Sequence, residues 1–153
     1  MLSYSDSATG VRSDQLVGFF VGWPNRPTSE RHLDILLGSD AVALAIDDGV
    51  VVGYATAISD GVLAAFIPLL EVLPAYQHRG IATELVRRLL AQLEHLYMVD
   101  VCCDADLEPF TVDWAFVRWI AGWACDSARR SRSLSLVAQA TFPHTGPPEG
   151  SGA

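Results

Sequence analysis

The stretch Leu69–Leu96, LLEVLPAYQHRGIATELVRRLLAQLEHL, joins an extended apolar run, a short polar turn and a periodic apolar pattern. The extended run stops at Pro74, and the polar turn leads to Gly80. After Gly80, apolar residues recur at every fourth position and their neighbours widen the same face, which predicts an amphipathic helix packed against a sheet. These apolar positions are Ile81, Ala82, Leu85, Val86, Leu89, Leu90 and Leu93. We therefore expect the chain to be organised around a strand–turn–helix unit.

Such a unit predicts an anion site where the helix begins. The first turn of a helix has unpaired N–H groups and carries the positive end of the helix dipole. Gly80 has no Cβ, so a phosphate can approach the backbone, and Ala82 is nearly as small. Gln77 and Arg79 can add side-chain donors. The spacing is Gln-x-x-Gly-x-Ala, which matches neither the Walker P-loop nor the dinucleotide-binding fingerprint.

The segment Val72–Ala82, VLPAYQHRGIA, resembles the acetyl-CoA-binding motif of the GCN5-related N-acetyltransferases (GNAT), Q/R-x-x-G-x-G/A after a strand. The resemblance is to small, single-domain bacterial members and is good from about Val50 to Phe116. It implies direct transfer of acetyl from acetyl-CoA to a primary amine in a ternary complex, without a metal. It also implies that the loop holds the pyrophosphate and the preceding strand pairs with the pantetheine arm. The implied cofactor-binding residues are Val72, Leu73, Gln77, His78, Arg79, Gly80, Ile81, Ala82 and Thr83.

Composition limits the class of protein. With 153 residues, half of them hydrophobic, the chain suits one domain with a sizeable core. We expect a single domain over residues 1–139 and a disordered tail over 140–153, where Pro, Gly and Ser accumulate. The net charge of −8 disfavours nucleic acid as a partner and would attract an amine.

The cysteines and the N-terminus favour a cytoplasmic protein. Cys102, Cys103 and Cys125 are odd in number, and two are adjacent, which suits neither a disulfide framework nor a zinc site. The first residues lack the pattern of a signal peptide. The long apolar stretch 49–70 is interrupted by a turn at Asp60-Gly61, so it predicts two buried strands rather than a membrane span.

The chain order predicts a mixed α+β fold. We expect a short strand within Leu2–Ala8, helices from Ser13-Asp14 through Phe20 and from Thr28 or Ser29 to Gly38, and strands Ala41–Ile46, Val50–Ser59 and Val62–Leu73. The helix after Gly80 then crosses over, so a strand at Leu96–Cys103 should lie parallel to the Val62–Leu73 strand. The sheet is thus expected to be mostly antiparallel, with one parallel pair at the acetyl-CoA cleft and helices on its flanks. The segment around Leu134–Val137 could supply a final strand.

Acetyl transfer to an amine needs a base, because only the neutral amine attacks and a lysine-like amine has a pKa near 10.4. Glu71, the only carboxylate on its strand, is our first candidate, and an edge or solvent-facing glutamate is the equal alternative. Strand parity does not decide between them, because this strand often carries a bulge. Asp104 is the second candidate, with helix capping as its alternative. Thr111 stands where the family usually has its tyrosine acid, so Tyr76, Tyr97 or water would protonate the thiolate instead.

The acceptor would be a small amine or a protein amino group. In acetyltransferases of this type the two N-terminal helices form one wall of the acceptor site, which makes Trp23, Arg26 and His32 candidate contacts. A packed Trp23 and a solvated Arg26 and His32 are the simpler interpretation. Thr111 and the tryptophan-rich segment 114–123 leave two alternatives open, a catalytically silent acyl-CoA-binding module and an interaction domain without a CoA site. A homodimer is compatible with the apolar composition.

Overall fold

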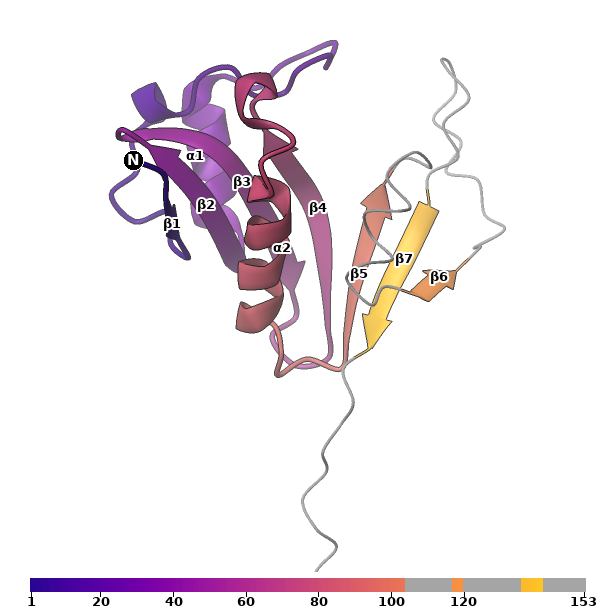
Figure 1. The fold of residues 1–153 in the computed structure, drawn as a ribbon. Helices are drawn as coiled ribbons and strands as arrows, with labels where there is room; N and C mark the ends of the chain where they lie inside the picture. Colours follow the sequence, from indigo (N-terminus) through magenta and orange to yellow (C-terminus); the bar gives the residue numbers. More distant parts are fainter. Residues whose placement is uncertain (104–116, 120–135, 142–153) are drawn as a thin grey trace, which may run out of the picture.

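A seven-stranded mixed sheet forms the frame of the protein (Figure 1). The computed structural model describes residues 1–103, 117–119 and 136–141. The elements are β1 (Ser3–Ser5), η1 (Ser13–Gln15), α1 (Ser29–Gly38), β2 (Ala41–Asp47), β3 (Val50–Ser59), β4 (Ala64–Val72), η2 (Pro74–Tyr76), α2 (Ile81–Gln92), β5 (Met98–Cys103), β6 (Val117–Trp119) and β7 (Leu136–Thr141). The strand order is β1-β2-β3-β4-β5-β7-β6. Among the described residues, β4 and β5 are the one pair of strands in parallel, which confirms the predicted fold class.

Helix α2 covers one face of the sheet and carries the apolar stripe that the sequence predicts. Leu85 and Leu89 are completely buried, with Ile81 and Leu93 beside them. They pack on small residues of β2 and β3, and Gly53 allows especially close contact, since a Cβ there would lie 3.2 Å from the Leu85 side chain. The main core therefore lies between α2 and the first strands.

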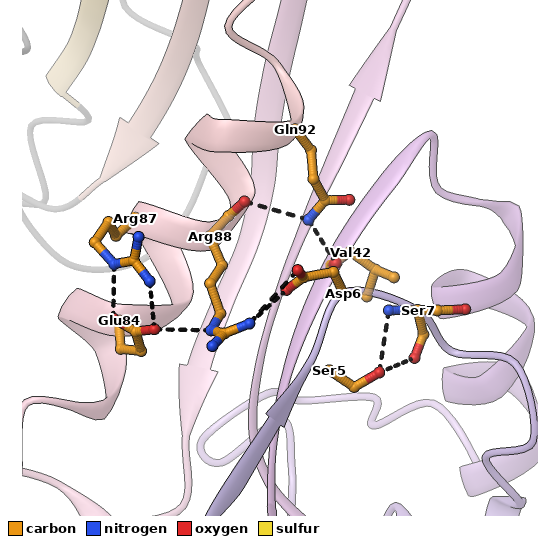
Figure 2. Close-up of polar contacts among 8 residues, drawn as sticks. All are labelled: Ser5, Asp6, Ser7, Val42, Glu84, Arg87, Arg88 and Gln92. Carbon is orange, nitrogen blue, oxygen red and sulfur yellow. Dashed lines mark hydrogen bonds and ion pairs between the residues drawn. The ribbon is translucent and has the colours of Figure 1, made fainter.

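Polar contacts also hold α2 against the N-terminal strands (Figure 2). The Arg88 guanidinium donates to Glu84, at 2.8 Å, and lies 3.2 Å from Asp6 in the segment after β1. Hydrogen bonds from Arg87 and Arg88 lower the pKa of Glu84 to about 2. Nearer the helix end, the Gln92 amide donates to the Val42 carbonyl of β2 at 2.9 Å.

Helix α1 lies on the opposite face, over a second core cluster. Thr28 caps it, as predicted, by accepting the Arg31 N–H at 3.3 Å. The predicted helix from Ser13-Asp14 through Phe20 is wrong, because only the short 3-10 turn η1 forms. Gly18 and Phe20 have φ values of 91° and 59°, and residues with left-handed backbone cannot continue a right-handed helix.

The turns explain where the strands begin. Asp48 and Gly49 both have positive φ, as a two-residue hairpin requires, which confirms the turn between β2 and β3. One oxygen of the Asp60 carboxylate accepts the N–H groups of residues 62, 63 and 64 at 2.8–3.1 Å. These bonds keep Val62 and Leu63 in the turn, so β4 begins at Ala64 rather than at Val62.

The C-terminal strands complete the sheet. β7 lies between β5 and β6 and is antiparallel to both. It ends at Thr141, two residues beyond the expected domain end at 139, and it includes the Leu136-Val137 part of the expected final strand. No strand was expected over residues 117–119, where β6 lies. The helix expected after Asp104 lies outside the described residues.

His32 of α1 is buried, with 1% of its surface exposed, against the expectation that it is solvated. Its ring lies within 4.4–5.1 Å of the rings of Tyr54, Phe20 and Phe19, measured between centroids. This burial lowers the pKa of His32 to about 4, so the imidazole is neutral at pH 7.

We expect the protein to lose stability as the pH falls from 7 to 5. The unfolded chain takes up a proton on His32 near pH 6.5, whereas the folded protein does not until about pH 4. The free energy of unfolding should therefore fall by about 2 kcal/mol over this range. Urea unfolding at the two pH values measures the change. His32→Phe keeps an aromatic ring there and should lose much less stability on acidification; an equal loss in both proteins would contradict the assignment.

Candidate functional site

The strands β4 and β5 separate at one end of the sheet. Residues Ala64–Ile67 of β4 pair in parallel with Met98–Val101 of β5, and this pairing ends at Ile67 and Val101. Beyond this point β4 pairs only with β3, and residues 102–103 of β5 pair only with β7. Pro68, which has no N–H to donate, stands where the pairing stops. Figure 1 shows the two strands diverging toward the carboxyl end of β4.

The free edge of β4 presents two backbone donors to this gap. The N–H of Leu73 donates to the Val52 carbonyl of β3 at 2.9 Å. Because successive N–H groups of a strand alternate between its two sides, those of Leu70 and Val72 point toward the gap. The Leu73 carbonyl accepts the Tyr76 N–H at 2.8 Å, so both backbone groups of Leu73 are used within the fold.

A tight turn carries the chain from β4 to the start of α2. His78 and Gly80 have φ values of 59° and 75°, and a Cβ at Gly80 would meet nothing within 4 Å. The first helical hydrogen bond runs from the Glu84 N–H to the Gly80 carbonyl at 3.1 Å. The N–H groups of residues 81, 82 and 83 therefore have no acceptor within the helix, and no side chain caps them. This helix start has the features of an anion-binding site.

The side chains around this turn differ in whether they are free to contact an anion. Gln77 donates its amide to the Val72 carbonyl at 3.0 Å, so it holds the turn against the end of β4. Arg79 is exposed and lies 5.1 Å from the centre of the Tyr76 ring. His78 and Thr83 are exposed, whereas the Ile81 side chain is buried in the core. Arg79, His78 and Thr83 are therefore the exposed cationic or polar side chains near this turn.

Glu71 lies on the α1 face of the sheet, opposite the face that α2 covers. It pairs directly with Tyr54 of β3, whose side chain belongs to the core cluster under α1. Its two carboxylate oxygens accept the N–H groups of Phe20 and Val21 at 2.8 and 3.1 Å. Glu71 thus fixes the segment between η1 and α1 to the end of β4.

A β-bulge determines this orientation. The register between β3 and β4 shifts so that Thr56 faces Leu69 and Ile58 faces Phe66, which leaves one extra residue on β4. Ile67 packs on the α2 face. Strict alternation would put Glu71 on that face too, and the extra residue reverses it. The bulge therefore gives the gap a helix start on one face and a carboxylate on the other.

Neither tyrosine considered as a substitute acid is well placed. Tyr97 donates its N–H to the Leu63 carbonyl, five residues before Pro68 and so roughly 17 Å along the strand from the start of the gap. The Tyr76 hydroxyl donates to Asp47 at 3.1 Å.

The other candidate residues fall elsewhere. Asp104 and Thr111 lie outside the described residues, as do Trp114 and Trp123. Within residues 1–103, 117–119 and 136–141, no three His, Cys, Asp or Glu residues come together as a metal site would need. The same part of the chain contains no helix with the length and apolar character to span a membrane.

Comparisons with known proteins agree with this geometry. The chain matches the model of the acetyltransferase (GNAT) family over residues 8–110. A solved protein from Deinococcus radiodurans R1, assigned as an acetyltransferase, is 44% identical, with 80% of this chain and 86% of that chain covered and a TM-score of 0.76. A search of curated proteins found no match.

Two more distant structures share the fold. The ribosomal-protein-S18-alanine N-acetyltransferase of Escherichia coli is 13% identical, with 95% of this chain and 97% of that chain covered and a TM-score of 0.73. The diaminobutyrate acetyltransferase of Paenibacillus lautus, solved with L-2,4-diaminobutyric acid and coenzyme A, is 11% identical, with coverage of 95% and 99% and a TM-score of 0.69.

We expect Glu71→Gln to release the segment before α1. The two N–H groups, of Phe20 and Val21, bond to different oxygens of Glu71, and in glutamine one of these positions is an NH2 group, which donates and cannot accept. Amide hydrogen exchange measured by NMR should accelerate at least tenfold at these two residues and stay unchanged in β2. Glu94→Gln, at an exposed position in the turn after α2, is the matched control. Unchanged protection at Phe20 and Val21 would contradict the described contact.

Proposed function

The chain belongs to the GNAT family of acetyltransferases, and from this premise we propose that the gap between β4 and β5 is where it transfers acetyl from acetyl-CoA to a primary amine. The observation that carries this proposal is the end of strand pairing at Pro68 beside the uncapped start of α2. Together they provide backbone donors at the start of α2 and along the free edge of β4.

We propose that acetyl-CoA is held at two places, the start of α2 and the gap between β4 and β5. The N–H groups of Ile81, Ala82 and Thr83 would bind the pyrophosphate, with Arg79 adding charge at the rim. The N–H of Val72 would pair with an amide of the pantetheine arm, since it lies on the free edge of β4, as does the N–H of Leu70. The turn between these places is kept in shape by Gln77.

The reaction needs a proton acceptor on the side from which the amine comes. The phosphates would bind where α2 begins, so the amine would approach from the α1 face, where Glu71 lies. We propose that the Glu71 carboxylate takes the proton from the ammonium, directly or through water. A backbone N–H on the free edge of β4 would stabilise the carbonyl oxygen as it gains charge. The thiolate can leave without an acid, because a simple thiol has a pKa near 8.5.

The acceptor class follows by analogy with fold relatives. One acts on the alanine of a ribosomal protein and another on L-2,4-diaminobutyric acid, so the fold serves both protein and small-molecule amines. For this chain the proposal includes either kind of amine as the acceptor. It also includes a cytoplasmic location, which is consistent with an acidic enzyme that uses acetyl-CoA. The catalytic roles of Asp104 and Thr111 remain predictions.

We expect Gly80→Asp to abolish acetyl-CoA binding, because it places a carboxylate where the pyrophosphate should lie. Gly80→Asn is the matched control, since asparagine has the same size, tolerates the left-handed backbone at this position and adds no charge. Calorimetric titration with acetyl-CoA should show measurable binding to the wild type and to Gly80→Asn, and none to Gly80→Asp. Equal affinities for the two variants would overturn the phosphate-site assignment.

We also expect Glu71→Gln to lower kcat by about 10²–10⁴-fold while the affinity for acetyl-CoA stays the same. The loss should shrink as the pH rises toward 10, because the amine substrate then becomes neutral without a base. Thiol release with an amine panel measures the rate, and Glu94→Gln is again the control. A deficit that is constant with pH would indicate that Glu71 only positions the segment before α1.

A further inference from the structure

A cavity of about 170 Å³ lies between the segment before α1 and the first turn of that helix. Leu16, Phe19 and Phe20 are among its apolar lining residues, and Arg26, Thr28 and His32 are among its polar ones. The hydroxyl groups near the cavity serve the local fold. Ser29 donates to the Leu16 carbonyl at 3.0 Å, and Thr28 caps α1. Arg26 and His32 are therefore the polar side chains left for a ligand.

His32 is the feature that marks this cavity as a binding site. It is almost fully buried, yet neither of its ring nitrogens has a hydrogen-bond partner among the described residues. The hydroxyl of Tyr54, whose ring lies 4.4 Å away between centroids, has none either. Buried polar groups in folded proteins are normally paired, so His32 is suited to a partner that the fold does not supply. A neutral imidazole offers one donor and one acceptor.

Arg26 gives the cavity a positive rim. It is exposed and forms no ion pair within the described part of the chain, whereas Arg12, Arg87 and Arg88 each contact a carboxylate. A free guanidinium is a strong and geometrically selective partner for a carboxylate. In a chain with a net charge of −8, this unpaired cation makes the rim complementary to an anionic group.

Phe20 links the cavity to Glu71. Its side chain lines the cavity, and its N–H donates to the Glu71 carboxylate at 2.8 Å. The Glu71 carboxylate therefore lies next to a residue that lines the same cavity as Arg26. A zwitterion with its carboxylate at Arg26 and its amine at Glu71 would match this charge pattern, and apolar methylene groups between them would contact Phe20.

We propose that this cavity binds the carboxylate of the acceptor, with Arg26 and His32 as the binding groups, so that the substrate is a small aliphatic amino acid rather than a protein or a simple amine. The inference rests on the proposed function, because it assumes that the amine reacts beside Glu71. The inference assigns substrate specificity to Arg26 and His32, which would bind the end of the substrate opposite the reacting nitrogen.

The test compares amino acids with plain amines of equal carbon number. The probes are β-alanine, 4-aminobutyrate and 5-aminopentanoate against propylamine, butylamine and pentylamine, titrated by calorimetry into the CoA-loaded protein. At least one amino acid should bind ten times more tightly than its plain amine. Arg26→Gln should remove this difference and raise KM for that amino acid at least tenfold, with kcat within twofold. Arg31→Gln, an exposed arginine of α1 that does not line the cavity, should change neither.

His32 provides a second readout. The imidazole ¹⁵N signals of His32, identified by their loss in His32→Phe, should shift when the preferred amino acid binds and stay in place with the plain amine. Equal affinities within every pair, or a preference that survives Arg26→Gln, would overturn the inference, as would a peptide amine that outcompetes all the amino acids. If acetyl-CoA fails to bind, the proposed function fails. Binding of the amino acids to the CoA-free protein then still tests the cavity.

Discussion

The end of backbone pairing between β4 and β5 is the constraint on which the rest of this structure depends. Pro68 cannot donate to a neighbouring strand, and the pairing stops directly before it. The bulge at the same place adds one residue to β4. These two irregularities open the sheet and turn Glu71 to the α1 face. A regular strand would have closed the gap and pointed this carboxylate at the core under α2.

The two faces of the sheet then serve different parts of one site. On the α2 face, a tight turn delivers a helix whose first N–H groups are free. On the α1 face, Glu71 holds the segment before α1 through two backbone hydrogen bonds. That segment has left-handed backbone at Gly18 and Phe20, which lets Phe19 and Phe20 both enter the core. The same segment forms a wall of the cavity beside His32, so the shape of this cavity depends on the position of Glu71.

The elements that local sequence determines were predictable. Either Thr28 or Ser29 was expected to cap α1, and Thr28 does. The Asp48-Gly49 hairpin needs only two residues with positive φ, and the stripe of α2 follows from its period. The prediction of a helix through Phe20 was wrong because the adjacent apolar residues Phe19 and Phe20 resemble part of a helical stripe. Gly18 and Gly22 on either side were the signal against a helix. The prediction that His32 is solvated was wrong for a different reason. Polar residues normally lie at the surface, and only the aromatic neighbours of His32 in the fold reveal its burial.

The sequence by itself determined the family resemblance, the mixed sheet and the turn at Gly80 that starts α2, because each depends on residues close together in the chain. Only the tertiary structure decided which face Glu71 occupies, since one extra residue in a strand reverses every side chain after it. It also decided that Gln77 shapes the turn, and it brought Arg26 and His32 to one cavity beside Phe20. These contacts join segments that are distant in sequence, and no local pattern records them.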